Sequence, residues 1–290
     1  KSAVGIPNGL GTAPGWWAER DGHIITALPG PPRELQKMWD LEIRPRIQNM
    51  NTGQVIITRT LKIIGLSEAL VDEMASPLLG GENPYTGIYA KRDGIHLRTI
   101  AQAASHDEAW NMLGPIENKL REIFTTSIWG VDSERPEEIL GEVLMKRGMT
   151  VATMESCTGG LLASTITDIP GSSSYFKGGI VSYTNDLKEA SGVDASLIKK
   201  YGAVSRQVAE NMAEGVRVRL GADFGVGITG VAGPNSLEGI QPGTVYISVS
   251  GGGHHKSDTY KFPQNNRSLI KDRSVISALL ALLRLLESTA

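Results

Sequence analysis

A run of side chains suited to nucleophilic chemistry occupies residues 155–158, Glu-Ser-Cys-Thr, directly before the glycine pair Gly159–Gly160. Serine and cysteine are common nucleophiles of acyl transfer, and each needs an activating base or a lowered pKa. The residues before the run are apolar and strand-like, and those from Leu161 onward recur at helical spacing. The run is therefore expected at the amino end of a helix, where free N–H groups and the helix dipole stabilise a developing oxyanion. We predict that the chemistry of the chain takes place here.

A serine nucleophile at position 156 needs a base, and the sequence offers two kinds. The histidine pair 254–255 lies in a glycine-rich turn between predicted strands, which does not suit a catalytic triad. Lys188 follows a strand-like segment that ends at Tyr183, and burial would lower the pKa of a lysine enough to make it a base. From the residues alone, two simpler interpretations stay open: Ser156 or Thr158 as a helix cap, and Lys188 as a solvated helix lysine.

Cys157 is the only cysteine and a rival nucleophile at the same helix terminus. The pKa of a thiol falls at such a terminus, which would favour the reactive thiolate. A lone cysteine is more often a small buried apolar residue, so its catalytic role is the minor alternative. A single cysteine also excludes an intrachain disulfide and a cysteine-rich zinc site.

Two later segments are expected to reach the same site. A buried strand over residues 223–229 ends at Thr229, and the glycines of the following turn, Gly230 and Gly233, let the backbone approach a ligand closely. The polar loop that continues this turn is a candidate lid. Arg267 begins the last helix and could pair with a phosphate, although an exposed arginine without such a role is equally consistent with the sequence.

The composition is typical of a soluble globular protein, with 290 residues, 40% hydrophobic, 21% charged and a net charge of −2. This near-neutral charge disfavours a dedicated DNA or RNA binder. No apolar run approaches the roughly 20 residues that cross a bilayer, and the polar, glycine-rich start predicts no signal peptide. The single cysteine fits a reducing compartment. We therefore expect a cytoplasmic protein with no membrane partner.

Strand and helix patterns predict three blocks, residues 1–50, 51–130 and 131–290. The first contains one strand-like run, a Pro-Gly-Pro-Pro turn and a short helix, which cannot close a hydrophobic core, and the sequence opens without methionine. We expect this block to be the tail of a larger domain. The second block reads β-α-β-β-α, a small two-layer α+β domain. The third alternates strands and helices, which predicts an α/β fold, a three-layer α/β/α sandwich.

Local signals predict particular elements of these blocks. Ser67 should cap a helix with Leu70 facing inward, and Asp93-Gly94 should form a tight hairpin. A later helix should carry Trp110 in its apolar stripe. The last helix, residues 267–287, is so apolar that we expect it to provide the surface of a homodimer.

Ordered motifs along the whole chain resemble the CinA family (competence/damage-inducible protein A). GTAPG at 11–15 and LPGPPRE at 28–34 resemble the end of the molybdopterin-binding-type domain that begins such proteins. Six motifs of the third block follow the CinA C-terminal domain in order: ESCTGG, PGSS, SYTNDLK, GAVS, ITGVAGP and PGTVYI. Six ordered matches over about 160 residues are not expected by chance.

The middle block resembles the K-homology-like domain of this family by its position. A K-homology domain that grips a nucleic-acid backbone needs a GxxG loop with basic neighbours. The comparable glycines, Gly80–Gly81, lack this spacing and are followed by Glu82. We therefore predict a structural spacer and no nucleic-acid partner.

The resemblance implies a nicotinamide mononucleotide deamidase, which releases nicotinate mononucleotide and ammonia. It implies that Ser156 is the nucleophile and that Lys188 and Tyr183 activate it, without a metal ion or an organic cofactor. Glu155 would orient Lys188 or face the pyridinium ring. The expected substrate-binding residues are Glu155, Thr158, Gly159, Gly160, Thr229, Gly230, Gly233 and Arg267. Many relatives carry a second arginine one turn after the first, where this chain has Lys271.

Two other functions compete with this hypothesis. An ADP-ribose pyrophosphatase would need a divalent metal and the complete first domain, most of whose contact residues precede the segment present here. A non-catalytic scaffold of competence or DNA repair is disfavoured by the neutral charge and the missing GxxG loop. We expect a small-molecule nucleotide as the partner of the site and a homodimer as the assembly.

Overall fold

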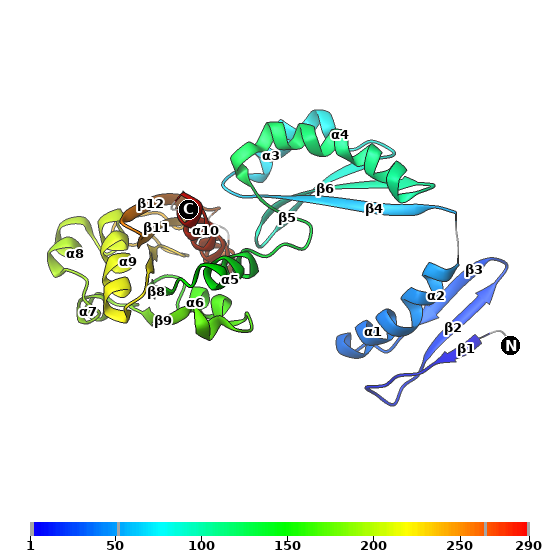
Figure 1. Cartoon of the computed structure of the whole chain (residues 1–290), viewed down its shortest axis with the longest axis horizontal. Coiled ribbons are helices and arrows are strands. Elements are labelled where there is room, and N and C mark those ends of the chain that lie inside the picture. The colour runs from blue at the N-terminus through cyan, green and yellow to red at the C-terminus, as the bar shows by residue number, and fades with distance from the viewer. Residues whose placement is uncertain (1–2, 51–52, 264–265, 289–290) are drawn as a thin grey trace. The chain divides into compact units, whose positions relative to one another are not determined.

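The computed structural model describes residues 3–50, 53–263 and 266–288 (Figure 1). Internal contacts divide the chain into two compact units, Lys1–Ile56 with Gln102–Ala109 and Ile57–Ala101 with Trp110–Ala290. All of the candidate catalytic residues belong to the larger unit. None of the helices in the described ranges is long and apolar enough to cross a membrane.

The smaller unit contains a three-stranded antiparallel sheet followed by helical turns. Its elements are β1 (Ala3–Ile6), β2 (Gly15–Arg20), β3 (His23–Ala27), α1 (Pro32–Met38) and α2 (Arg44–Asn49). Its small core consists of Ile6, Trp17, Met38 and Ile43. The predicted strand and helix on either side of the Pro-Gly-Pro-Pro turn are confirmed. The sequence does not reveal β1 and β2, because their short runs lack a clear alternation of apolar and polar residues.

Most of the middle block belongs to the larger unit and forms a four-stranded sheet with two helices. The elements are β4 (Val55–Ile63), α3 (Glu68–Ala75), β5 (Tyr85–Lys91), β6 (Gly94–Ala103), α4 (His106–Phe124) and β7 (Ile128–Val131). The sheet order is β5-β6-β4-β7. Lys91 pairs with Gly94 across a two-residue turn, which confirms the predicted hairpin. Ser67 caps α3 as predicted, since its Oγ accepts from the N–H of Leu70 at 3.2 Å.

Two side chains that were expected to face inward in this domain are exposed instead. Leu70 and Trp110 are each 40% exposed. In α3 the buried positions are Val71 and Ala75, so Leu70 is rotated by one residue away from the core side. The ring of Trp110 lies under the guanidinium of Arg59, 4.6 Å from its centroid, and this cation–π contact holds it at the surface.

The rest of the larger unit is an α/β domain around a five-stranded mixed sheet. Its strands are β8 (Val151–Glu155), β9 (Phe176–Val181), β10 (Phe224–Gly230), β11 (Thr244–Gly251) and β12 (His254–Lys261). In the order β12-β11-β10-β8-β9, the last three strands are parallel and the first three antiparallel. The helices are α5 (Pro136–Arg147), α6 (Leu161–Thr167), α7 (Asn185–Ala190), α8 (Ala195–Tyr201), α9 (Arg206–Leu220) and α10 (Arg267–Ser288). The prediction of an α/β domain after a small α+β domain is confirmed.

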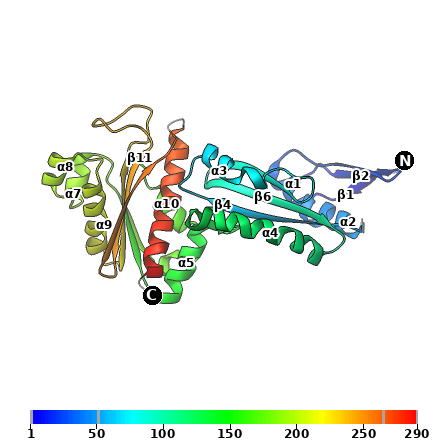
Figure 2. The same cartoon turned by 90° about the horizontal axis from the view of Figure 1, so that it is seen from above.

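Helices cover both faces of this sheet, with α9 on one side and α5 and α10 on the other (Figure 2). Met154 of β8 packs on the α9 side against Met212 and Val216. Two glycines of β10 permit this close approach. A Cβ at Gly225 or Gly227 would overlap the backbone of α9, so any larger residue would push the helix off the sheet.

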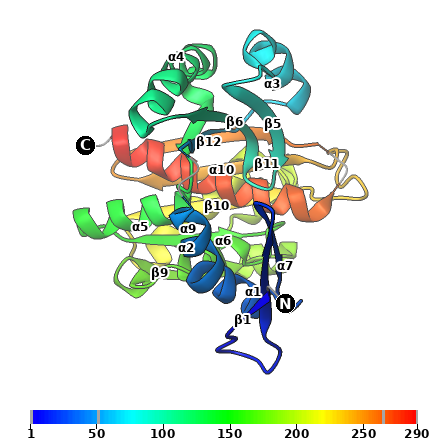
Figure 3. The ribbon, with the colours of Figure 1, turned by 90° about the vertical axis from the view of Figure 1, so that its right-hand side faces the viewer.

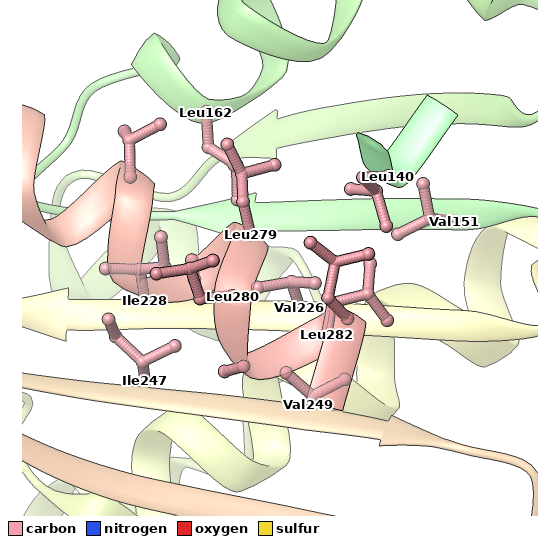
Figure 4. Packing of buried hydrophobic residues seen from close by; sticks show 14 of the residues in the cluster. Leu140, Val151, Leu162, Val226, Ile228, Ile247, Val249, Leu279, Leu280 and Leu282 are labelled. Atoms are coloured by element: carbon pink, nitrogen blue, oxygen red, sulfur yellow. The ribbon is translucent and has the colours of Figure 1, made fainter. Parts of the chain in front are cut away.

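The apolar helix α10 lies across the opposite face of the sheet (Figure 3). Leu279 and Leu282 are each 1% exposed and pack among side chains of β8, β10 and β11, such as Val226 and Ile247 (Figure 4). The expectation that α10 forms a dimer surface is therefore wrong, because the apolar residues of the helix are buried in the core of its own chain. The homodimer itself stays a prediction.

Candidate active site

The carboxyl ends of the parallel strands bring the central serine into position. The N–H of Ser156, directly after β8, donates to the carbonyl of Ile228 in β10 at 2.9 Å. The N–H of Ser182, directly after β9, donates to the carbonyl of Glu155 at 2.8 Å. Ligands of open α/β sheets collect at the carboxyl ends of the strands, and these contacts place Ser156 at that edge.

The side chain of Lys188 lies directly against Ser156. Its Nζ donates to Ser156 Oγ at 2.9 Å and to the carbonyl of Ser182 at 2.8 Å. Lys188 is only 2% exposed and Ser156 only 8%. The fold thus brings together a hydroxyl and an amine that are 32 positions apart in the sequence. The interpretation of Lys188 as a solvated helix lysine is wrong.

The short helix α7 turns Lys188 toward the serine. Thr184 caps this helix, because its Oγ1 accepts from the N–H of Leu187 at 3.3 Å. The N–H of Lys188 donates to the carbonyl of Thr184 at 3.0 Å. Leu187 is 48% exposed, whereas the neighbouring lysine is buried, which reverses the usual pattern of a surface helix. This reversal indicates that the amine has a role inside the site.

Burial lowers the pKa of the Lys188 amine, because the charged form loses its hydration. A Cys157 thiolate would act in the opposite direction, as does the negative charge of Glu238. A lowered pKa enlarges the neutral fraction of the amine, and only the neutral amine can accept a proton from Ser156. The distance and the pKa direction therefore both suit a general base.

Cys157 is buried beside the same turn and is 6% exposed. Burial raises the pKa of its thiol to about 12, so the thiol stays protonated near neutral pH. Because the thiolate is the nucleophilic form, the structure favours Ser156 over Cys157 as the nucleophile.

Glu155 has a different position from the one expected. One of its carboxylate oxygens accepts from the N–H groups of Gly160 at 3.1 Å and Leu162 at 3.0 Å, and the other accepts from Ala163 at 2.8 Å. The side chain is 1% exposed. The expectation that Glu155 orients Lys188 or faces a substrate is therefore wrong, because its carboxylate caps the first turn of α6.

Only some N–H groups of the polar turn between β8 and α6, residues 156–160, are free to hold an oxyanion. The N–H of Gly159 donates to the carbonyl of Ser156 at 3.1 Å, and that of Gly160 to Glu155. Within the described residues, the N–H of Thr158 makes no hydrogen bond, and its buried Oγ1 also has no partner. Of Thr158, Gly159 and Gly160, only Thr158 therefore has an N–H without a hydrogen-bond acceptor among the described residues.

Tyr183 lies at the mouth of the site rather than beside the nucleophile. It is 54% exposed, and its hydroxyl accepts from Nη2 of Arg267 at 3.0 Å. Nη1 of the same arginine donates to the carbonyl of Gly233 at 2.8 Å. The described residues include no hydrogen bond from Tyr183 to Ser156 or Lys188. The structure therefore gives Tyr183 a position for holding a substrate, and no contact through which it would relay the proton.

A cavity of about 320 Å³ opens beside the serine, a volume at the lower end of those that hold small molecules. It is lined by Ser156, Cys157, Tyr183, Gly230–Leu237 and Arg267. Gly230 and Gly233 thus lie where the sequence predicts them. Thr229 does not, because it is fully buried and its Oγ1 donates to the carbonyl of Ala203 at 2.8 Å. The expectation that Thr229 contacts the substrate is wrong.

Two cations near the cavity could hold an anion. Arg267 lines the cavity itself. Lys271, one turn later in α10, reaches the polar turn, since a Cβ placed at Gly159 would lie 3.9 Å from its Nζ. Among the residues that the structure describes, no three His, Cys, Asp or Glu side chains are grouped so that they could hold a metal ion.

Glu238 is a residue near the site that the sequence does not reveal. It lies in the polar loop after β10, and its Oε2 accepts from the N–H of Val204 at 3.2 Å. The charge of this carboxylate reaches Lys188, where it favours the protonated amine. A lone glutamate in a loop of glycine, proline and serine carries no spacing signal, so only the folded chain identifies it.

Comparisons with known proteins agree with the order of a small α+β domain followed by an α/β domain. Residues 58–130 match the damage-inducible protein CinA KH domain, and residues 133–286 match the CinA C-terminal domain. A competence-damage inducible protein of Caldanaerobacter subterraneus is 42% identical over 285 residues, 97% of this chain and 68% of that protein. Another from Desulforudis audaxviator is 43% identical over 248 residues, 84% of this chain and 60% of that protein. The chain thus spans 60% to 68% of the length of these two relatives.

Solved structures show the same likeness for the C-terminal part. A competence-damaged protein (CinA) superfamily protein from Escherichia coli is 29% identical, with a TM-score of 0.51, and covers 55% of this chain and 94% of its own. The corresponding protein from Enterobacter cloacae is 26% identical, with a TM-score of 0.51 and coverage of 56% and 98%. With its KH domain followed by the CinA C-terminal domain, the chain belongs to the CinA family.

Proposed function

We propose that the chain is an amidohydrolase that deamidates nicotinamide mononucleotide to nicotinate mononucleotide and ammonia through Ser–Lys acyl transfer. The observation that carries the reaction type is the buried Lys188 amine, 2.9 Å from Ser156 Oγ. The choice of substrate rests on the resemblance of the ESCTGG and SYTNDLK motifs to the CinA C-terminal domain.

In the first half of the reaction, the neutral amine of Lys188 accepts the proton of Ser156 while Oγ attacks the carboxamide carbon. The N–H of Thr158 stabilises the negative charge that develops on the carboxamide oxygen. The Lys188 ammonium then gives its proton to the nitrogen of the leaving group. Ammonia departs, and the acyl group remains on Ser156 as an ester.

In the second half, a water molecule gives a proton to Lys188 as its oxygen attacks the ester carbon. The proton returns to Ser156 Oγ when the carbon–oxygen bond to the enzyme breaks, which releases the carboxylic acid product. Each half uses the same hydroxyl and the same amine, and neither requires a metal ion or an organic cofactor.

The substrate would occupy the cavity beside Ser156. Arg267 would pair with the phosphate at the mouth, where it also orients Tyr183. The backbone at Gly230 and Gly233 would approach the sugar and the ring. Glu238, whose charge already acts on Lys188, takes the role expected of Glu155 and attracts the positively charged pyridinium.

Incubation of the full chain with nicotinamide mononucleotide tests this proposal. We expect ammonia and nicotinate mononucleotide in equal amounts, at a rate that EDTA does not change. ADP-ribose in a parallel reaction tests the pyrophosphatase alternative, and we expect no release of AMP. Absence of ammonia would contradict the proposal. Metal-dependent cleavage of ADP-ribose without ammonia release would instead favour a pyrophosphatase that uses the first block.

A further inference from the structure

A second cavity lies within the larger unit, away from the catalytic serine. Its volume is about 670 Å³, roughly twice that of the cavity beside Ser156. The walls come from the β4–α3 connection (Ile63–Ser67), from Ile95 of β6 and from the end of β12 (Thr259–Pro263), with Arg273 of α10 among them. This volume falls in the range of pockets that hold small organic ligands.

The guanidinium of Arg273 is an unpaired cation in this cavity. Its Nε is buried and has no hydrogen-bond partner, and in the described part of the chain the side chain forms no ion pair. Burial lowers its pKa, and the charge of Glu68 acts in the opposite direction without forming an ion pair. The Nε alone is buried, whereas the side chain as a whole is only partly buried, so the guanidinium can pair with an anion in the cavity that it lines.

Two other arginines of the larger unit, Arg217 and Arg92, have the carboxylate partner that Arg273 lacks. Arg217 contacts Glu214 at 2.7 Å, and Arg92 contacts Asp272 at 2.8 Å. Because Asp272 directly precedes Arg273 and is already paired, the nearest carboxylate in the sequence is not available to it. Among the described residues, Arg273 thus lines the cavity without a carboxylate partner, and such a cation can pair with an anionic ligand.

The remaining walls define the rest of that ligand. Tyr260 and Phe262 are stacked, with ring centroids 5.8 Å apart and planes within 13°. Together with Ile63 and Ile95 they give the cavity a flat apolar side. Burial raises the pKa of Tyr260 to about 12, so its phenol stays neutral and does not compete for the cation. Lys261 adds a second positive charge at the rim.

We propose that this cavity binds a small organic anion of nucleotide size, with a flat ring against the Tyr260–Phe262 wall and a phosphate or carboxylate on Arg273. A charge-assisted hydrogen bond from the guanidinium, which lines the cavity, would hold the anion, and the ring would cover apolar surface. This inference is independent of the proposed deamidase activity, because it uses none of the residues around Ser156.

Calorimetric titration of the full chain with adenosine 5′-monophosphate tests the site. Arg273→Met removes the cation, and Arg267→Met is the matched variant in the same helix, at the catalytic cavity. We expect Arg273→Met to weaken binding at least about tenfold, the effect of losing one charge-assisted hydrogen bond, and Arg267→Met to change it less than about threefold. Adenosine alone and inorganic phosphate alone should each bind more weakly than the intact nucleotide.

Several results would overturn the proposal. Loss of binding in Arg267→Met with full binding in Arg273→Met would assign the nucleotide to the catalytic cavity. Equal affinity for phosphate and for the nucleotide would show that the ring does not contribute to binding. No binding at millimolar nucleotide would show that the cavity is not a nucleotide site. Arg273→Met should melt at or above the temperature of the unmodified chain without ligand, and a clear fall would give Arg273 a structural role instead.

Discussion

At the scale of single residues, the protonation state of Lys188 decides whether Ser156 can act as a nucleophile. The amine is nearly inaccessible to water and contacts the serine hydroxyl directly. Two contacts hold its Nζ, and one of them, the Ser182 carbonyl, comes from the backbone and cannot titrate. The pKa of the amine therefore depends mainly on burial and on the charges around it.

The first prediction concerns pH. The protonated form of Lys188 is inactive, so kcat/KM should rise with pH through the lowered pKa of this amine and reach a plateau above it. Glu238→Gln removes a charge that raises this pKa, so the rising limb should move to lower pH. Steady-state or pre-steady-state kinetics over a range of pH measure this shift. Glu142 is an exposed glutamate of α5, and Glu142→Gln serves as the control. An unchanged rising limb in Glu238→Gln would show that this limb of the pH profile does not report the ionisation of Lys188.

The second prediction concerns the stability cost of the same amine. Below the lowered pKa of Lys188 the folded chain carries a buried charge that the unfolded chain would hydrate. Lys188→Met should therefore abolish turnover while leaving the free energy of unfolding at pH 7 equal to, or about 1–2 kcal/mol above, that of the unmodified chain. Urea unfolding followed by circular dichroism measures it. A large loss of stability would indicate that Lys188 is mainly structural.

At the scale of elements, the strand ends and the helix starts fix the site. Glu155 illustrates this, because its carboxylate holds three N–H groups at the start of α6. Gly160, the residue before the helix, has φ +92 and no side chain that could cap it. The glutamate thus supplies from β8 the cap that the turn lacks, and it fixes the turn that carries Ser156.

The third prediction follows from this cap. Glu155→Ala should lower the free energy of unfolding by about 2–4 kcal/mol, because buried charge-assisted hydrogen bonds are lost and N–H groups are left without partners. Glu142→Ala on the exposed side of α5 serves as the control and should change it by less than about 0.5 kcal/mol. Chemical denaturation measures both, and equal stability of the two variants would contradict the capping role.

The fourth prediction concerns the packing of α9 on β10. Gly227→Ala adds a methyl group that would overlap the backbone at Ala209, and we expect a loss of at least about 2 kcal/mol. Gly215→Ala is the matched control in α9 itself, where a Cβ meets open space. It should instead stabilise the chain by about 0.5–1 kcal/mol, because alanine favours the helix. Thermal unfolding of the two variants compares them, and a neutral Gly227→Ala would contradict the packing.

Local sequence patterns predict some of these elements well and others poorly. The cap at Ser67 and the hairpin before Gly94 depend on a few neighbouring residues, and both are confirmed. The exposure of Trp110 depends on Arg59, a residue of another strand, which a helical pattern cannot show. The contact of Ser156 with Lys188 is equally non-local. Without the family resemblance, the sequence does not decide whether these two residues meet.

At the scale of the whole molecule, burial decides how an apolar helix is interpreted. The sequence of α10 is equally suited to a dimer surface and to a core, and the structure shows the core. The chain spans 60% to 68% of the length of two of its relatives. The homodimer, the cytoplasmic location and the metal-independent reaction stay predictions.

The measurement that tests the central claim most directly is ammonia release from nicotinamide mononucleotide by the unmodified chain, Ser156→Ala, Lys188→Met and Cys157→Ala. We expect Ser156→Ala and Lys188→Met each to lose at least about a thousandfold in kcat, since they remove parts of one catalytic unit. Cys157→Ala should stay within about tenfold of the unmodified chain, because its protonated thiol takes no part. Undiminished turnover in Ser156→Ala, or its loss in Cys157→Ala alone, would contradict the Ser–Lys account.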